Sequence, residues 1–435
     1  MGLLRGVGLD LRWRVMTLKH AGQGLTSVGK RREHNEDSFL VDDALGLYAV
    51  ADGMGGHAAG EVASRMAIEI VAEQIKAGSD ALKKLAQDAT HENKLAAQQL
   101  VEKAIQEACA RINKTSQADR SKRGMGTTFD CVVVVGNRAI LGHVGDSRVY
   151  LSRQGKVHRL TEDHTMLAMA LKAGIGKKED FAESDWANSL TRAVGPQPSV
   201  QVDTLLIECQ SGDQFFLCSD GLHGYLSDEE APQVIASMGS GTPLSRLIDL
   251  ANDRGGKDNI TGVLVAIHGD PTKTMHTVPI DTKMGLLEKI PLFAFLNYKE
   301  RSAILSIITT KHFLVGSEII REGAQGEDLY IVMKGRVTVE KAGLRIGELT
   351  AGAFFGEMGL VDNAPRSATV RALEPTECMI ITRAGMMNIM RREQMMAVKL
   401  LWSFVQTLSE RLRNANTGMV EARTKIGSIP FNPQD

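Results

Sequence analysis

Short acidic motifs recur along the first part of the chain, each at the end of an apolar run. They are NED at 35–37, ADG at 51–53, GDS at 145–147, SDG at 219–221 and KDN at 257–259. A single motif of this kind is typical of a turn, because Asp-Gly and Asp-Asn are common loop dipeptides. Five in one chain indicate acids gathered at strand ends. Such carboxylates repel one another unless cations neutralise them, and their hard oxygen atoms suit Mg²⁺ or Mn²⁺.

Apolar runs and helical periodicity predict the elements that would position these acids. The expected strands are Leu45–Val50, Phe129–Val135, Ala139–Val144, Val149–Ser152, Gln214–Cys218 and Gly262–Ile267. Helices are expected after Glu61 and around 97–112, where apolar residues recur three and four positions apart. The stretch VYLSRQGKVHRL predicts a hairpin with a Gln-Gly turn. Together these features favour an α+β protein, with an antiparallel sheet core and helices outside it.

Composition excludes several classes of function. The 435 residues are 43% hydrophobic and 24% charged, which leaves room for two or three domains. A formal net charge of -1 argues against binding to nucleic acid or to a membrane surface. Five scattered cysteines without a CxxC pair fit reduced structural thiols. Because no apolar run approaches the ~20 residues of a membrane span, and the arginine-rich start is no signal peptide, we expect a cytoplasmic protein.

A series of motifs resembles the metal-dependent Ser/Thr protein phosphatases of the type 2C class, in their bacterial form. In chain order the motifs are GKRREHNEDSF, VADGMGGHAAGE, GTTFDCVVV, GHVGDSRVYL, LTEDHT, TRAVG, FFLCSDGL and KDNITGVLV. The resemblance covers about residues 24–268. It implies two antiparallel sheets flanked by helices on both sides, an αββα sandwich.

The resemblance implies a binuclear metal site of Mn²⁺ or Mg²⁺. The acid matching Asp52 bridges two ions, helped by the carbonyl of the glycine matching Gly53. The acids matching Asp220 and Asp258 hold one of the two ions. Two ions of this kind activate a shared water that attacks the phosphorus atom in line, so no phosphoenzyme and no nucleophilic Cys or Ser is needed.

Further residues complete the implied site. The acids matching Glu36 and Asp37 lie on the other side of the metal pair, often acting through water, and the acid matching Asp146 belongs to a third, weaker metal site. Arg32 matches the arginine that binds the substrate phosphate, to which a guanidinium can donate two hydrogen bonds.

The donor of the leaving-group proton stays unassigned. Some relatives place a His directly after the DG, where this chain has Met54. His57 lies three residues later, and we interpret it as a structural, capping or indirectly acting residue.

The segment FFGEMGLVDNAPRSATV at 354–370 has free backbone N–H groups at a tight turn beside an arginine, which is typical of an anion site. Alone, the Gly-Glu and Arg residues would rather predict a β-roll turn with a buried Glu–Arg pair. Together with IPLFAFL and SEIIREGAQGEDLYIVMKGRVTVE, it resembles the cyclic-nucleotide-binding domain over about residues 285–415. That resemblance implies a β-roll with flanking helices. It also implies that Glu357 binds the ribose 2′-hydroxyl and Arg366 the cyclic phosphate, with backbone groups near Gly356, Met358 and Ser367.

The resemblance favours one base of the cyclic nucleotide but does not determine which base binds. A threonine at the position of Ser367 often accompanies cGMP, whereas serine occurs in the bacterial catabolite activator type, which binds cAMP. We favour cAMP. The final helix supplies base contacts in that type, which gives Asn414, Asn416 and Thr417 as candidates.

The final helix has an apolar seam at alternating spacings of three and four, formed by Val398, Leu401, Val405, Leu408 and Leu412. This seam fits packing against its own β-roll. It fits pairing with a second subunit equally well, so the sequence leaves a homodimer open.

The main prediction is a Ser/Thr protein phosphatase that is regulated by a cyclic nucleotide. It would hold two metal ions, or three if Asp146 binds one. Its partners would be phosphorylated proteins, either Ser/Thr kinases or their targets. Two alternatives stay open: a C-terminal domain that only dimerises, and a non-catalytic sensor of phosphoproteins or cyclic nucleotide. The expected division is an extension (1–23), a phosphatase domain (24–268), a linker (269–284), a nucleotide-binding domain (285–415) and a tail (416–435).

Overall fold

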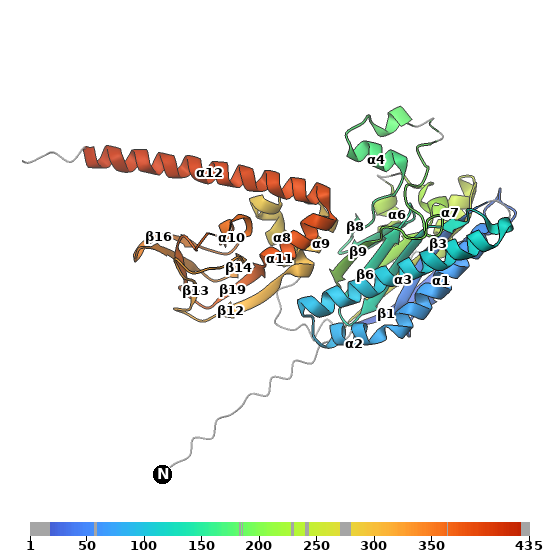
Figure 1. The fold of residues 1–435 in the computed structure, drawn as a ribbon, viewed down its shortest axis with the longest axis horizontal. Helices are drawn as coiled ribbons and strands as arrows, with labels where there is room; N and C mark the ends of the chain where they lie inside the picture. Colours follow the sequence, from blue (N-terminus) through green and yellow to red (C-terminus); the bar gives the residue numbers. More distant parts are fainter. Residues whose placement is uncertain are drawn as a thin grey trace, which may run out of the picture. The chain divides into compact units, whose positions relative to one another are not determined.

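The computed structural model describes residues 18–55, 59–181, 184, 186–227, 230–239, 243–269, 280–362 and 364–427. The chain divides into two compact units, Met1–His276 and Thr277–Asp435. Figure 1 shows the ribbon of each unit. No helix in the described ranges is both long and apolar enough to cross a membrane.

The first unit contains two antiparallel sheets that pack face to face. The first sheet consists, in spatial order, of β1 (Lys19–Ser27), β11 (Ile260–His268), β10 (Gln214–Cys218), β7 (Arg148–Arg153) and β8 (Lys156–Arg159). The second consists of β2 (Asp37–Asp42), β3 (Leu47–Met54), β5 (Phe129–Val135), β6 (Arg138–Val144) and β9 (Asp203–Glu208), with β4 (Gly126–Thr127) paired to β3.

Helices cover the outer faces of both sheets. The helices α1 (Ala59–Ala77) and α3 (His91–Ala118) pack on the second sheet, with α2 (Ser79–Gln87) beside them. The helices α6 (Ala231–Gly239) and α7 (Leu244–Asp253) pack on the first sheet. The remaining segments are α4 (Met166–Lys172), α5 (Asp220–His223) and the 3₁₀ turns Arg120–Lys122 and Lys178–Phe181. The predicted αββα sandwich is therefore confirmed (Figure 1).

Local sequence signals predicted several elements closely. The strands expected at Phe129–Val135 and Gln214–Cys218 have those bounds. The predicted hairpin joins β7 to β8, and its turn residues Gln154 and Gly155 have positive φ angles of 50° and 74°. Such angles suit a tight two-residue turn between twisted strands.

The sequence did not predict the first strand. β1 begins at Lys19, inside the expected extension that would end at residue 23. Its sequence, KHAGQGLTS, has too few apolar residues to show a strand pattern. Two of its positions are glycines because neighbouring aromatic rings occupy the space that a side chain would need. A Cβ on Gly22 would lie 2.3 Å from the ring of Tyr48, and one on Gly24 would lie 2.4 Å from the ring of Phe39.

The second unit is a β-roll of two four-stranded antiparallel sheets. One has the order β12 (Thr309–Phe313), β19 (Thr376–Ile381), β14 (Leu329–Lys334), β17 (Phe354–Phe355). The other has the order β13 (Glu318–Ile320), β18 (Thr369–Ala372), β15 (Val337–Lys341), β16 (Leu344–Leu349). The helical segments are α8 (Ile280–Lys289), the 3₁₀ turn Pro291–Phe293, α9 (Tyr298–Ile307), α10 (Met358–Val361), α11 (Arg383–Arg392) and α12 (Gln394–Gly427). The predicted β-roll with flanking helices is confirmed.

Helices cross two of the expected boundaries. α8 begins at Ile280, within the segment 269–284 that was expected to be a linker; residues 270–279 lie outside the described ranges. α12 continues to Gly427, so the predicted tail from residue 416 begins inside a helix. The five cysteines are free and buried, as expected of structural thiols.

Candidate functional site

The ends of strands from both sheets of the first unit bring the predicted acids together. Asp37 and Asp52 are direct partners across β2 and β3. Asp220 is the first residue of α5, directly after β10, and Asp258 lies just before β11. The carboxyl groups of Asp52 and Asp220 share a hydrogen bond, although 168 positions separate them. Convergence of the acids, expected from the sequence, is therefore observed for this pair.

Burial and mutual repulsion oppose ionisation of these acids. Burial, then the neighbouring carboxylates Asp37 and Asp220, raise the pKa of Asp52 well above its usual value. Burial also raises the pKa of Asp37 to about 7, and burial with repulsion from Asp220 raises the pKa of Asp146 to about 7. Such shifts mark a place where negative charge lacks compensation by protein cations.

The oxygen atoms of the cluster fit a hard cation. Asp37 Oδ2 accepts hydrogen bonds from Ser219 Oγ at 2.9 Å and from Thr261 Oγ1 at 2.6 Å, whereas Asp37 Oδ1 and Asp220 Oδ1 are buried without a hydrogen-bond partner. A hydrogen bond between Asp52 and Asp220 requires a proton on one carboxyl group. A divalent cation would take the place of that proton and satisfy the unpaired oxygen atoms.

In the described part of the chain, no three His, Cys, Asp or Glu side chains are arranged to hold one metal ion as they stand. The acids contact other protein groups instead. Asp52 and Asp220 contact each other, Asp37 faces Ser219 and Thr261, and Asp258 faces an arginine. Binding of an ion would therefore require these carboxylates to exchange partners.

Arg32 lies at the solvent side of the acids. Its Nη2 donates to Asp258 Oδ2 at 2.7 Å, and both side chains are partly exposed. This hydrogen bond raises the pKa of Arg32 further. The guanidinium therefore remains a cation that solutes can reach, as a phosphate-binding group requires.

Glu36 is held against the start of α1. Partial burial raises the pKa of its carboxyl group, while Arg32 and the N–H of Gly60 lower it. The N–H of Gly53 donates to the carbonyl of Glu36 at 3.2 Å, and a Cβ on Gly53 would lie 2.2 Å from the carbonyl of Gly60. Only glycine permits this approach of three backbone segments. Met54 continues β3 and pairs with Gly126, and His57 lies outside the described residues.

Sequence reasoning missed residues that fix the acidic loops. Asn259 Oδ1 accepts the N–H of Glu36 at 2.8 Å, and Asn259 Nδ2 donates to the carbonyls of Val28 and His34. The position of Asn259 directly after Asp258 in the KDN motif could have identified it as a residue of the site. Ser219 and Thr261 were similarly visible beside the acidic motifs.

The loop that carries Asp146 is held by two buried histidines, which sequence reasoning also missed. His223 Nε2 donates to the carbonyl of Asp146 at 2.9 Å. His164 Nδ1 accepts the N–H of Gly145 at 3.1 Å, and Gly145 has a φ of 116°. Because Nδ1 accepts, His164 is the neutral Nε2–H tautomer, with Asp203 and Arg192 beside Nε2. Burial lowers the pKa of His164 to about 4, which matches that state.

In the second unit, the predicted cassette surrounds a buried arginine. Arg366 Nη1 donates to the carbonyl of Gly356, and Nη2 donates to the carbonyl of Asp328, both at 2.9 Å. Arg366 Nε is buried without a partner. Glu357 is buried, whereas Met358, at the start of α10, and Ser367 are exposed. The cassette thus holds an arginine that still lacks one acceptor, as an anion site would.

The candidate base contacts on α12 are not placed against the cassette. Asn416 and Thr417 are exposed, and Thr417 Oγ1 donates to the carbonyl of Arg413 in its own helix. The side chain of Asn414 lies outside the described part of the structure.

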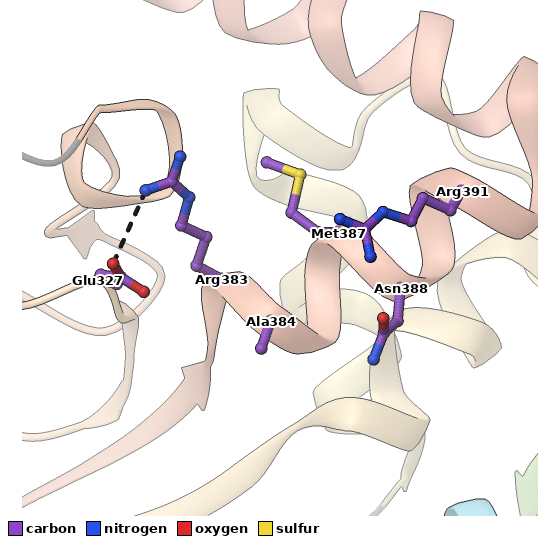
Figure 2. A pocket seen from close by; sticks show the side chains of 6 residues that line it. All are labelled: Glu327, Arg383, Ala384, Met387, Asn388 and Arg391. Carbon is purple, nitrogen blue, oxygen red and sulfur yellow. Dashed lines mark ion pairs between the residues drawn. The ribbon is translucent and has the colours of Figure 1, made fainter.

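A cavity of about 380 Å³ lies beside α11 (Figure 2). Its lining consists of Glu327, Arg383, Ala384, Met387, Asn388 and Arg391. The Arg383 guanidinium, at the start of α11, lies 3.7 Å from the Glu327 carboxylate across this cavity. Glu327 directly precedes Asp328, whose carbonyl binds Arg366. One loop therefore contacts both the cassette arginine and α11.

Comparisons with known proteins agree with both units. The family model for protein phosphatase 2C matches residues 26–259, and that for the cyclic nucleotide-binding domain matches residues 310–393. The serine/threonine phosphatase stp of Listeria monocytogenes is 36% identical over 247 residues, which is 55% of this chain and 93% of that protein. The protein phosphatase PhpP of Streptococcus pneumoniae is 32% identical over 249 residues, 56% of this chain and 96% of that protein.

Two solved structures are similar to more than half of this chain. The serine/threonine phosphatase of S. agalactiae is 32% identical, with a TM-score of 0.49 over 57% of this chain and 99% of that one. The catalytic domain of the serine threonine protein phosphatase PstP, solved in complex with 2 manganese ions, is 31% identical, with a TM-score of 0.47 over 58% of this chain and 100% of that one.

Proposed function

Because this chain belongs to the protein phosphatase 2C family and is a serine/threonine protein phosphatase with a C-terminal cyclic-nucleotide-binding domain, we propose that a cyclic nucleotide regulates its metal-dependent hydrolysis of phosphoserine and phosphothreonine. The observation that carries the metal-dependent part is the Asp52–Asp220 contact within a group of acids whose pKa values are raised. Buried carboxyl groups without a neutralising partner lower the stability of the folded protein, and a bound cation would remove that cost.

We assign the metal-holding residues as follows. Asp52 and the carbonyl of Gly53 would lie between two Mn²⁺ or Mg²⁺ ions, with Asp220 and Asp258 on one side. Glu36 and Asp37 would lie on the other side, the latter oriented by Ser219 and Thr261. Asp146 would serve a third ion. When bound, divalent ions of this kind lower the pKa of a shared water and polarise the phosphoryl oxygens.

The protein's own groups orient the substrate. Arg32 would exchange its hydrogen bond to Asp258 for two hydrogen bonds to the substrate phosphate, which frees Asp258 for metal binding. Asn259 holds the Glu36 backbone in place during this exchange. The group that protonates the leaving alkoxide stays unassigned, since Met54 cannot do so.

In the second unit, the proposed ligand is a cyclic nucleotide, with cAMP favoured. Arg366 Nε would bind the cyclic phosphate, together with backbone groups at Gly356, Met358 and Ser367, and Glu357 would accept the ribose 2′-hydroxyl. The loop that contacts both Arg366 and α11 supports communication between the cassette and the helices. Regulation still requires different affinities for two states of the protein.

The experiment is phosphopeptide hydrolysis under a matrix of Mn²⁺, Mg²⁺, cAMP and cGMP. We expect no turnover without a divalent ion. We also expect the rate of hydrolysis to change when cAMP saturates the C-terminal domain. Calorimetry with cAMP and cGMP runs in parallel. Binding without any change in rate would end the regulatory proposal, and absence of binding would favour a C-terminal domain that only dimerises. Kinases as partners and a cytoplasmic location stay predictions from the sequence.

A further inference from the structure

The cavity beside α11 has basic side chains near both of its ends (Figure 2). On the opposite face of this helix, Gly385 and Met386 are buried, which fixes the rotation of α11 about its axis. The volume of about 380 Å³ falls in the range of small-molecule sites, roughly 300–1,000 Å³. Five of the six lining residues lie on the outward face of α11: Arg383, Ala384, Met387, Asn388 and Arg391.

The spacing of the two arginines indicates the shape of a ligand. Arg383 and Arg391 are eight residues apart in α11, so their Cα atoms lie about 12 Å apart along the helix axis. In Figure 2 their guanidinium groups lie on either side of Met387. One phosphate or carboxylate group is too small to contact both guanidinium groups in this arrangement. A molecule with an anionic group at each end could contact one guanidinium with each of its ends.

The charge of the lining favours an anion. Two guanidinium groups and one carboxylate, that of Glu327, leave an excess of one positive charge. The Glu327 carboxylate lies 3.7 Å from the Arg383 guanidinium, which is longer than a hydrogen bond, and the Glu327 side chain is 57% exposed. An exposed ion pair of this kind contributes little free energy. A phosphate group that accepts two hydrogen bonds from Arg383 could therefore displace Glu327.

Between the two arginines, the lining combines apolar and polar surface. Met387 and Ala384 offer carbon and sulfur atoms, and the exposed carboxamide of Asn388 can donate and accept hydrogen bonds. Hydroxyl groups on a short carbon skeleton fit both kinds of surface. Phosphate groups fit the planar guanidinium fork and carry more charge than carboxylates. We propose that this cavity binds a small hydroxylated bisphosphate, such as a sugar bisphosphate, with one phosphate group at each arginine.

The cavity is separate from the cassette, although one loop borders both. Glu327 lines the cavity, whereas its two neighbours in the chain contact Arg366. The carbonyl of Asp328 accepts a hydrogen bond from Arg366 Nη2 at 2.9 Å, and a Cβ on Gly326 would lie 2.7 Å from Arg366 Nε. None of the six lining residues belongs to the proposed metal or cyclic-nucleotide sites. The bisphosphate site therefore stands independently of the proposed function.

Calorimetry on the full chain tests the site, with glucose 1,6-bisphosphate and glucose 6-phosphate as probes. Divalent ions are left out, so that no metal-dependent hydrolysis of the probes occurs. We expect the bisphosphate to bind at least about tenfold more tightly than the monophosphate, because only the bisphosphate contacts both arginines. Arg383→Gln and Arg391→Gln should each lower its affinity to about that of the monophosphate. Urea unfolding at the wild-type midpoint shows that each variant is folded.

The matched control is Arg392→Gln. Arg392 is an exposed neighbour on α11 that does not line the cavity, so this variant should bind the bisphosphate as the wild type does. Equal affinities for the two probes, or no binding of the bisphosphate, overturn the proposal. Unchanged binding in Arg383→Gln and Arg391→Gln would place the ligand elsewhere on the protein, and an equal loss in Arg392→Gln would mean attraction to the charge of the helix alone. Either result also overturns it.

Discussion

At the scale of residues, the acids of the first unit differ in what their oxygen atoms contact. Asp258 accepts a hydrogen bond from Arg32, and Asp37 accepts hydrogen bonds from two hydroxyl groups. Asp52 and Asp220 contact each other, and Asp220 also accepts a hydrogen bond from the N–H of Gly221. Each of these two acids also has a raised pKa, to which burial and a neighbouring carboxylate contribute. If cations bind here, this pair should respond most strongly to their removal and to mutation.

Replacement of Asp52 or Asp220 by Ala should lower phosphopeptide turnover by about a thousandfold or more, since both are proposed to hold the ions that activate water. His57→Ala should retain measurable activity. The rate is measured at saturating Mn²⁺ with a phosphothreonine peptide. Asp80→Asn, a surface change on α2, serves as the control and should leave the rate unchanged. Complete loss in His57→Ala would contradict our interpretation of that residue.

His164 predicts a dependence of stability on pH. Burial lowers its pKa from 6.5 to about 4, so the folded protein keeps it neutral while the unfolded chain protonates it. Its contribution is therefore complete above pH 6.5 and is lost as the pH falls from 6.5 to about 4, by up to about 3 kcal/mol. Urea unfolding at pH 7.5, 6 and 5 should show a smaller loss in His164→Gln. The expectation fails if both proteins lose equal stability over that range.

At the scale of elements, the turn between β3 and α1 depends on close backbone contact. Gly53, near the end of β3, lies between the carbonyls of Glu36 and Gly60, which a Cβ would meet at 2.5 and 2.2 Å. This contact holds the loop of Glu36, the strand of Asp52 and the first turn of α1 together. The glycine pattern of the ADG motif therefore reflects packing as well as the metal site.

Gly53→Ala should destabilise the first unit by more than about 2 kcal/mol, because both contacts are to backbone atoms that cannot move aside. Gly285→Ala is the matched control. Gly285 lies in α8, and a Cβ there would meet no neighbouring atom within 4 Å, so alanine should stabilise the helix by about 0.5–1 kcal/mol. Denaturant midpoints measure both changes. A wild-type midpoint in Gly53→Ala would disprove the close approach.

At the scale of the whole molecule, the chain consists of two compact units with separate cores. The proposed catalytic acids all belong to the first unit and the proposed nucleotide site to the second. Each unit should therefore keep its own chemistry when separated, and only regulation should need the intact chain.

A fragment of residues 1–276 should hydrolyse phosphopeptide at a rate within about threefold of the full chain without nucleotide, and cAMP should not change that rate. A fragment of residues 277–435 should bind cAMP. Initial rates and calorimetry make the two measurements, with the full chain as the control. If the first fragment still responds to cAMP, the nucleotide acts somewhere other than the cassette.

Local patterns in the sequence determined much of this protein. Strand runs, the Gln-Gly turn and helical spacing depend on neighbours within a few residues, so they predicted β5, β10, the β7–β8 hairpin and α12. The order of the acidic motifs and the cassette carried the resemblance to both families, and the αββα sandwich and the β-roll followed from it. β1 was missed because its glycines are explained only by the rings of Tyr48 and Phe39.

Only the tertiary structure decided which groups meet. Arg32 and Asp258 are 226 positions apart, and no local pattern encodes their ion pair or the contact between Asp52 and Asp220. The KDN motif placed Asn259 beside Asp258, but the backbone groups that Asn259 and His164 bind could not be predicted, because polar contacts have no sequence period. The apolar seam of α12 could be read from the sequence, but which of its faces remains uncovered depends on how the helix packs on its own β-roll.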